Sequence, residues 1–124
     1  MKVLSGLTPP PEDARLLVDT STWDDAGVAR FGDGMQAIVQ SVDFFPPVVD
    51  DPWWFGRIAA ANALSDLYAM GAEPFSALNV VAFPSKDLPL DLLTAILEGA
   101  SDAFREAGVL LLGGHSVTDT GVKY

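Results

Sequence analysis

Apolar residues along this chain fall into two spacings, one typical of strands and one typical of helices. Two short apolar runs, Ala26 to Phe31 and Met35 to Asp43, predict strands. Gly32-Asp33-Gly34 between them predicts a hairpin turn, because glycine accepts positive φ. Pro46 and Pro47 end the second strand, since proline cannot donate to a ladder. Before these strands, Pro9-Pro10-Pro11 predicts an extended connector.

A long alanine-rich stretch follows and predicts a helix that begins at Pro52 and is capped at Gly71. The stretch is apolar nearly all round, so we expect the helix to be buried. Phe75 to Phe83 then predicts a buried strand, which Pro84 closes.

A second helix is predicted from Pro89 to a stop at Gly108. Val109 to Leu112 predicts another strand, followed by a loop at residues 113–116. The resulting order, ββαβαβ, predicts an α/β domain with its helices on one face of a single sheet. The polar side of the second helix is expected to be solvated and to carry no chemistry; it comprises Asp91, Glu98, Asp102 and Arg105.

Composition limits the possible partners. The chain has 124 residues, enough for one domain or part of one, and no apolar run approaches the roughly 18 residues of a membrane span. The net charge of -10 argues against nucleic acid and anionic membranes, and a polyphosphate ligand would need divalent cations to offset repulsion. The absence of cysteine excludes a disulfide, a thiolate metal site and a cysteine nucleophile within these residues.

The first predicted helix carries one polar cluster. Asn62, Ser65 and Asp66 fall within a sector of about 100° around the helix axis. A carboxylate on a buried helix needs a partner such as a metal ion, whereas a solvated edge of the helix explains the same pattern without one.

Further candidates lie at strand ends. Asp24-Asp25, preceded by Thr22, suits either a turn or Mg²⁺, which prefers carboxylate oxygens. Asp43 ends the next strand, where a lone aspartate is most often a cap. The loop at residues 113–116 offers backbone N–H groups for an anion, or is a plain turn. His115 is the single histidine, which disfavours a zinc site or a Ser-His-Asp triad.

The usual phosphate loops are missing from the sequence. Neither Gly-x-x-x-x-Gly-Lys-Ser/Thr nor Gly-x-Gly-x-x-Gly is present. Separate aspartates with a Gly-Gly segment favour phosphate bound mainly through metal bridges.

Four segments, in this order along the chain, resemble selenophosphate synthetase: Thr22–Val28, Ser41–Pro52, Phe55–Gly71 and Leu111–Ser116. A looser version of the pattern is shared with aminoimidazole ribonucleotide synthetase, thiamine-phosphate kinase and a hydrogenase-maturation protein. Asp-Phe-Phe-x-Pro-Val-Val-Asp-Asp-Pro, joined to Phe-Gly-Arg-Ile-Ala-Ala, is much more specific to selenophosphate synthetase.

The resemblance implies ATP-dependent conversion of selenide and water to selenophosphate, AMP and orthophosphate by a cytoplasmic Mg²⁺-dependent homodimer. It implies half of a dimeric barrel, like the N-terminal domain of aminoimidazole ribonucleotide synthetase. Trp53-Trp54 and Trp23 depart from the family pattern, the latter standing where a basic residue is common. By position, the resemblance implies magnesium ligands at Asp25 and Asp66, ATP contacts at Thr22, Trp23, Asp24, Asp43 and Asp66, and ATP contacts across the dimer interface from Gly114, His115 and Ser116.

The resemblance also implies that residues 1–124 are part of an N-terminal ATP-binding and dimerisation domain. The family's glycine-rich loop with catalytic cysteine or selenocysteine and lysine, and its C-terminal domain, have no counterpart here. Met1–Leu7 resembles the helix that follows that loop, and we expect the chain by itself to be inactive. The alternatives are a module that only dimerises, or another ATP-using enzyme such as thiamine-phosphate kinase or aminoimidazole ribonucleotide synthetase.

Overall fold

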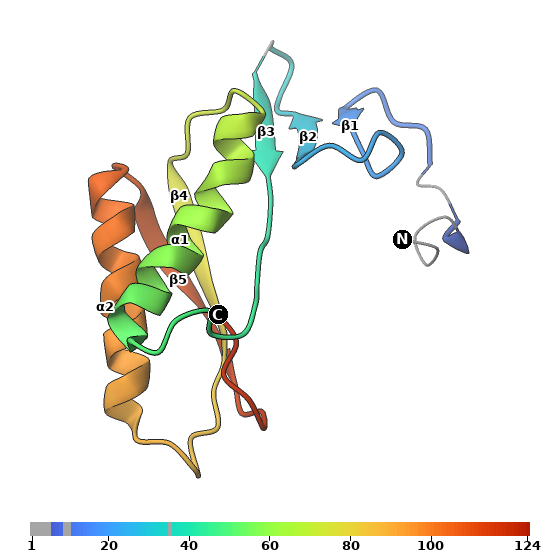
Figure 1. Cartoon of the computed structure of the whole chain (residues 1–124). Coiled ribbons are helices and arrows are strands. Elements are labelled where there is room, and N and C mark those ends of the chain that lie inside the picture. The colour runs from blue at the N-terminus through green and yellow to red at the C-terminus, as the bar shows by residue number, and fades with distance from the viewer. Residues whose placement is uncertain (1–5, 9–10, 35) are drawn as a thin grey trace.

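Two helices and two separate sheets make up the part of the chain that the computed structural model describes, which is residues 6–8, 11–34 and 36–124 (Figure 1). The residues outside these ranges include Met1–Ser5 of the predicted helix start, Pro9 and Pro10 of the predicted connector, and Met35. In chain order the elements are β1 Leu16–Val18, β2 Gly27–Arg30, β3 Ala37–Gln40, α1 Pro52–Ala69, β4 Ser76–Ala82, α2 Leu90–Glu106 and β5 Leu110–Val117.

The predicted α/β class is confirmed, and both helices begin and end within two residues of their predicted limits. The prediction of a single sheet is wrong. Strands β1, β2 and β3 form one antiparallel sheet, while β4 and β5 form a second, parallel one. Strand β1 was not predicted, because its three residues are too short to show a period. The two helices lie on one face of β4 and β5, and β3 lies beside the C-terminal end of α1 (Figure 1).

Helix α1 begins where Asp51 caps it. The Asp51 carboxylate accepts hydrogen bonds from the backbone N–H groups of Trp53 and Trp54, at 2.9 and 3.1 Å.

Helix α1 is buried on one face only, which corrects the prediction of burial all round: Trp54 is 53% exposed and Tyr68 55% exposed. In the described residues, no helix is long and apolar enough to cross a bilayer.

The two helices touch through glycine. A Cβ atom added to Gly56 of α1 would lie 1.8 Å from the carbonyl oxygen of Ile96, and one added to Gly99 of α2 would lie 1.9 Å from that of Trp53. Backbone therefore meets backbone at this crossing. The close approach places Phe55 and Ile96 in one core, which is completed by Ala59, Ala60, Leu64, Val81, Phe83, Ala100, Ala103, Phe104, Val109 and Tyr124.

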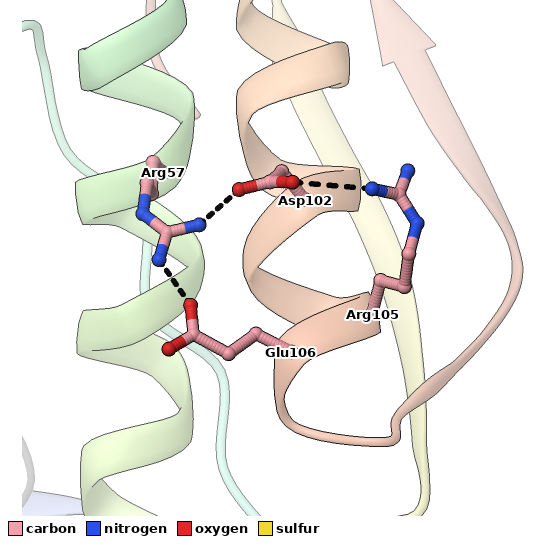
Figure 2. A network of polar contacts seen from close by, with 4 residues as sticks. All are labelled: Arg57, Asp102, Arg105 and Glu106. Atoms are coloured by element: carbon pink, nitrogen blue, oxygen red, sulfur yellow. Dashed lines mark hydrogen bonds and ion pairs between the residues drawn. The ribbon is translucent and has the colours of Figure 1, made fainter.

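An ion-pair network crosses from α1 to α2 (Figure 2). The Arg57 guanidinium, 25% exposed, pairs with Asp102 and Glu106, and Asp102 also pairs with Arg105 at 3.1 Å. Arg57 also lies over the Trp53 ring, 5.8 Å from its centroid. This corrects the prediction that the polar side of α2 is merely solvated: Asp102 ties the helices together.

Strand β5 continues through the residues that were predicted as a loop. Residues 113–116 pair in parallel with β4, Asn79 beside Gly114 and Val80 beside His115. The loop prediction is wrong because Gly113, at φ 143, absorbs a register shift and lets the strand continue. The prediction that the strand at Phe75–Phe83 is buried holds only at its end: Val81 and Phe83 are buried, whereas Leu78 and Val80 are exposed.

The last residues fold back onto the core. Lys123 bridges Ala82 in antiparallel fashion, and Tyr124 exchanges two backbone hydrogen bonds with Phe45, at 3.1 and 3.2 Å. The buried Tyr124 ring meets Phe55 edge-on, and its hydroxyl donates to Asn79 Oδ1. Burial raises the pKa of the Tyr124 hydroxyl. These contacts anchor the segment that links β3 to α1.

Candidate functional site

A cavity of about 910 Å³ opens along β1, β2 and β3. The turn before β2 supplies Trp23, Asp24 and Asp25 to its wall. The end of β3 supplies Gln40 and then Ser41. Apolar side chains, Leu7, Leu16 and Val18, line another part of it. The cavity therefore combines carboxylates with an apolar wall.

The turn before β2 is held by its own side chains. The Asp19 carboxylate accepts the Ser21 backbone N–H at 2.7 Å, and the Thr22 hydroxyl donates to the Asp24 carboxylate. The Ser21 hydrogen bonds keep the pKa of Asp19 below its usual value. Trp23, between these anchors, has a φ of 60°. The turn thus presents Trp23, Asp24 and Asp25 in a defined arrangement.

Asp66 of α1 is connected to this cavity through Ser41. The Ser41 hydroxyl, on the cavity wall, donates to Asp66 Oδ2 at 2.9 Å. Asp43 lies beside Asp66, and its Oδ2 atom is buried without a hydrogen-bond partner among the described residues. Burial, together with the neighbouring Asp66 carboxylate, raises the pKa of Asp43. Asp43 and Asp66 thus place two carboxylates side by side, one of them with an unsatisfied oxygen. A cation bound there would reduce the repulsion between the carboxylates and pair with that oxygen.

The donors present fit a hard divalent cation in part. Carboxylate oxygens are the ligands that Mg²⁺ prefers, and it is usually held by one or two carboxylates together with waters and phosphates. In the ranges that the structure describes, no group of three or more His, Cys, Asp or Glu side chains is placed to hold a metal ion. The convergence of Asp24, Asp25, Asp43 and Asp66 on one point therefore stays a prediction.

Other predicted residues lie elsewhere. Asn62 and Ser65 are exposed, and the Ser65 hydroxyl donates to the Asn62 carbonyl at 2.6 Å, so of that helical cluster Asp66 is the member bonded to a distant segment. Gly114, His115 and Ser116 lie on β5 and do not line the cavity. His115 is next to Val80 on the sheet face that no helix covers.

Two residues of the site were not singled out from the sequence. Ser41 stands two positions before Asp43 in the strand predicted from Met35 to Asp43. In a strand this spacing places both side chains on one face, and so it could have indicated Ser41. Asp19 opens the run Asp-Thr-Ser-Thr, which is typical of a turn that bonds its own backbone.

Comparison with known families gives a match over most of the chain. The model of a family described as "AIR synthase related protein, N-terminal domain" matches residues 23–124. Similar proteins include two that carry the name "Selenide, water dikinase". That of Pelobacter propionicus is 57% identical over 114 residues, and that of Nitratidesulfovibrio vulgaris strain Miyazaki F is 56% identical over 124 residues. These alignments cover 92% and 99% of this chain but 32% and 35% of those proteins, so the chain spans about a third of their length.

Solved structures share the fold. The structure of a Thermus thermophilus protein described as "tt0281" has a TM-score of 0.79 and 28% identity, covering 98% of this chain and 39% of that one. "AaThiL complexed with AMPPCP and TMP" has a TM-score of 0.73 and 20% identity, covering 81% of this chain and 33% of that one. The resemblance drawn from the sequence motifs is thereby confirmed at the level of family and fold.

Proposed function

The chain belongs to the family described as AIR synthase related protein, N-terminal domain, and on that premise we propose that it is the nucleotide- and Mg²⁺-binding domain of a selenide, water dikinase. The observation that carries this proposal is 57% identity, over 92% of the chain, to a protein of that name. The whole protein would convert ATP, selenide and water to selenophosphate, AMP and orthophosphate. The described cavity would hold the nucleotide.

The charges in the cavity support a cation-dependent mode of binding. Its described lining residues include Asp19, Asp24 and Asp25 but no lysine, arginine or histidine. A triphosphate would therefore be repelled unless divalent cations stood between it and the carboxylates. Asp25 and Asp66 would hold Mg²⁺, which would neutralise the phosphate charge that grows during transfer.

The chain's own residues would position the ligand. The Thr22 hydroxyl orients the Asp24 carboxylate, and the Ser41 hydroxyl fixes one oxygen of Asp66. Asp43, in contact with Asp66, would complete the acidic wall next to the phosphates. Such fixed groups lower the cost of orienting a phosphoryl group for transfer.

We infer that the domain works as a homodimer. The β4–β5 sheet has helices on one face, while its other face exposes Leu78, Val80 and Leu110. An uncovered apolar sheet face of this kind supports association with a second copy, burying on the order of 2,000 Å² or more. His115 lies on that face, and Gly114 and Ser116 adjoin it, so all three could reach the partner's nucleotide.

Thermal melting with Mg²⁺, ATP and both together tests the nucleotide site. A ligand that binds the folded state at 100 times its Kd adds about 2.7 kcal/mol to the free energy of unfolding. We expect the two ligands together to stabilise more than either does alone. Asp66→Asn should remove most of this gain. Glu98→Gln, on the exposed side of α2, should keep it; Asp102 is unsuitable as a control because it pairs with Arg57.

Two further measurements separate the alternatives. Sedimentation should show a dimer that Leu78→Asp converts to monomer. A dimer whose stability does not respond to Mg²⁺ and ATP would favour the dimerisation module instead. For the whole protein, selenide-dependent formation of AMP from ATP is expected. The 124 residues alone, which contain no cysteine, should bind MgATP without this turnover.

A further inference from the structure

Trp23 has an unusual backbone for a large residue. Its φ of 60° is the one positive value found for a non-glycine residue in the described part of the chain. The left-handed conformation is disfavoured for a residue with a side chain, because its Cβ comes too close to the following carbonyl oxygen. Such strain persists only where neighbouring contacts impose it, and it concentrates at functional sites.

Hydrogen bonds hold the chain on both sides of Trp23. On one side Asp19 holds the Ser21 backbone, and on the other the Thr22 hydroxyl bonds to Asp24. The Trp23 indole itself is 55% exposed. In residues 6–8, 11–34 and 36–124 no aromatic ring, cation or hydrogen-bond acceptor pairs with it. The turn is therefore fixed while its largest side chain is left without a partner.

The cavity around Trp23 has two chemically different parts. Asp24 and Asp25 would attract a cation and, through it, phosphate. Trp23 and the apolar side chains of Leu16 and Val18 would instead favour a flat, weakly hydrated group. A ligand with an anionic chain at one end and an aromatic ring at the other matches both parts.

We propose that the Trp23 indole is the surface on which the base of the bound nucleotide stacks, an inference that rests on the proposed nucleotide site. Stacking uses the π face that every base has, so Trp23 contributes affinity for the base without reading its edge. A purine, which offers a larger face than a pyrimidine, should bind more tightly. Binding of the phosphates would depend on cations and carboxylates, and binding of the base would depend on Trp23.

The test compares a ligand that has a base with one that lacks it. Calorimetry would measure the Kd of MgATP and of magnesium tripolyphosphate for the wild type, Trp23→Ala and Trp23→Phe. Trp54→Ala is the matched control, because Trp54 is exposed to a similar extent, 53% against 55%, but lies at the start of α1. We expect Trp23→Ala to weaken MgATP about 5- to 100-fold and leave tripolyphosphate unchanged. Trp23→Phe should retain most of the affinity, and Trp54→Ala should retain all of it.

A glycine variant separates the ring from the backbone. Glycine adopts positive φ without strain, so Trp23→Gly removes the indole while keeping the turn. It should weaken MgATP as much as Trp23→Ala does. If Trp23→Gly binds MgATP as tightly as the wild type does, the stacking role is wrong. It is also wrong if Trp23→Ala weakens tripolyphosphate as much as it weakens MgATP. Neither result would contradict the nucleotide site itself. Failure of the wild type to bind MgATP at all would overturn both.

Discussion

The Ser41 hydroxyl donates a hydrogen bond to the Asp66 carboxylate, with 2.9 Å between Ser41 Oγ and Asp66 Oδ2. This bond joins the end of β3 to α1 across 25 residues of sequence. Ser41 also lines the cavity whose wall includes Asp24 and Asp25. The Asp66 carboxylate on α1 is therefore connected through Ser41 to the cavity that contains the two carboxylates of the turn. The candidate site therefore depends on how the small antiparallel sheet is held against α1.

Loss of this bond should be measurable. Ser41→Ala should lower the free energy of unfolding by about 1 kcal/mol, the usual net value of one hydrogen bond. A double-mutant cycle with Asp66→Asn, followed by urea denaturation, would measure the coupling between the two side chains. Ser85→Ala is the control, because Ser85 is exposed and its hydroxyl has no bond in the described structure. Additive effects of the two substitutions would show that the contact contributes nothing.

The helices and most strands were predictable because their signals are local. Pro52 and Gly71 bracket α1, and Pro89 and Gly108 bracket α2, so turn chemistry fixed both helices to within two residues. The division into two sheets was not predictable. It depends on pairing between distant strands, about which the period of a single strand carries no information.

The site was predictable by residue type but not by arrangement. Asp24, Asp25, Asp43 and Asp66 stand out as acidic positions next to predicted strands and a helix. Tertiary packing decides how these residues are arranged. It brings Asp43 into contact with Asp66, and it places Asp25 on the wall of a cavity that Asp66 reaches through Ser41. Gly113 misled the prediction for a local reason: Gly-Gly is typical of a turn, yet here one glycine accommodates a register shift within a strand.

The crossing of the two helices predicts a severe effect at Gly56. A methyl group there would meet the Ile96 carbonyl at 1.8 Å, and backbone cannot rotate away as a side chain can. Gly56→Ala should therefore force the helices apart and lower the free energy of unfolding by about 3 kcal/mol or more. Gly121→Ala is the control, since open space surrounds Gly121. Equal urea midpoints for the two variants would contradict the packing described.

The Arg57 network predicts a smaller effect that depends on salt. Arg57→Met keeps the aliphatic packing but removes the pairs with Asp102 and Glu106, which are 39% and 70% exposed. Because solvent screens such pairs, the loss should be about 1 kcal/mol at low ionic strength and should shrink at 1 M salt, where the Debye length is about 3 Å. Arg105→Met removes one pair from a side chain that is 74% exposed and should have little effect. A loss that does not change with salt would indicate packing, not charge.

Tyr124 predicts a dependence of stability on alkaline pH. Burial raises the pKa of its hydroxyl in the folded state above the ordinary value of about 10. The folded state thus favours the protonated phenol. The stability that this preference contributes is fully present below the pKa of Tyr124 in the unfolded chain, and it is lost as the pH rises through the pKa in the folded state. The free energy of unfolding of the wild type should accordingly fall above about pH 10.

Tyr124→Phe should remove that decline. At pH 7 the variant should be less stable by about 1 kcal/mol, because Asn79 Oδ1 loses its donor, while the backbone pairing with Phe45 is retained. As the pH rises above 10, the wild type should lose stability and the two proteins should converge. Tyr68→Phe, at an exposed position on α1, should leave the wild-type decline unchanged. Urea denaturation at pH 7, 9 and 10.5 measures these differences. A constant gap between wild type and Tyr124→Phe across that range would mean that the ionised phenolate is tolerated where it lies, against the burial described.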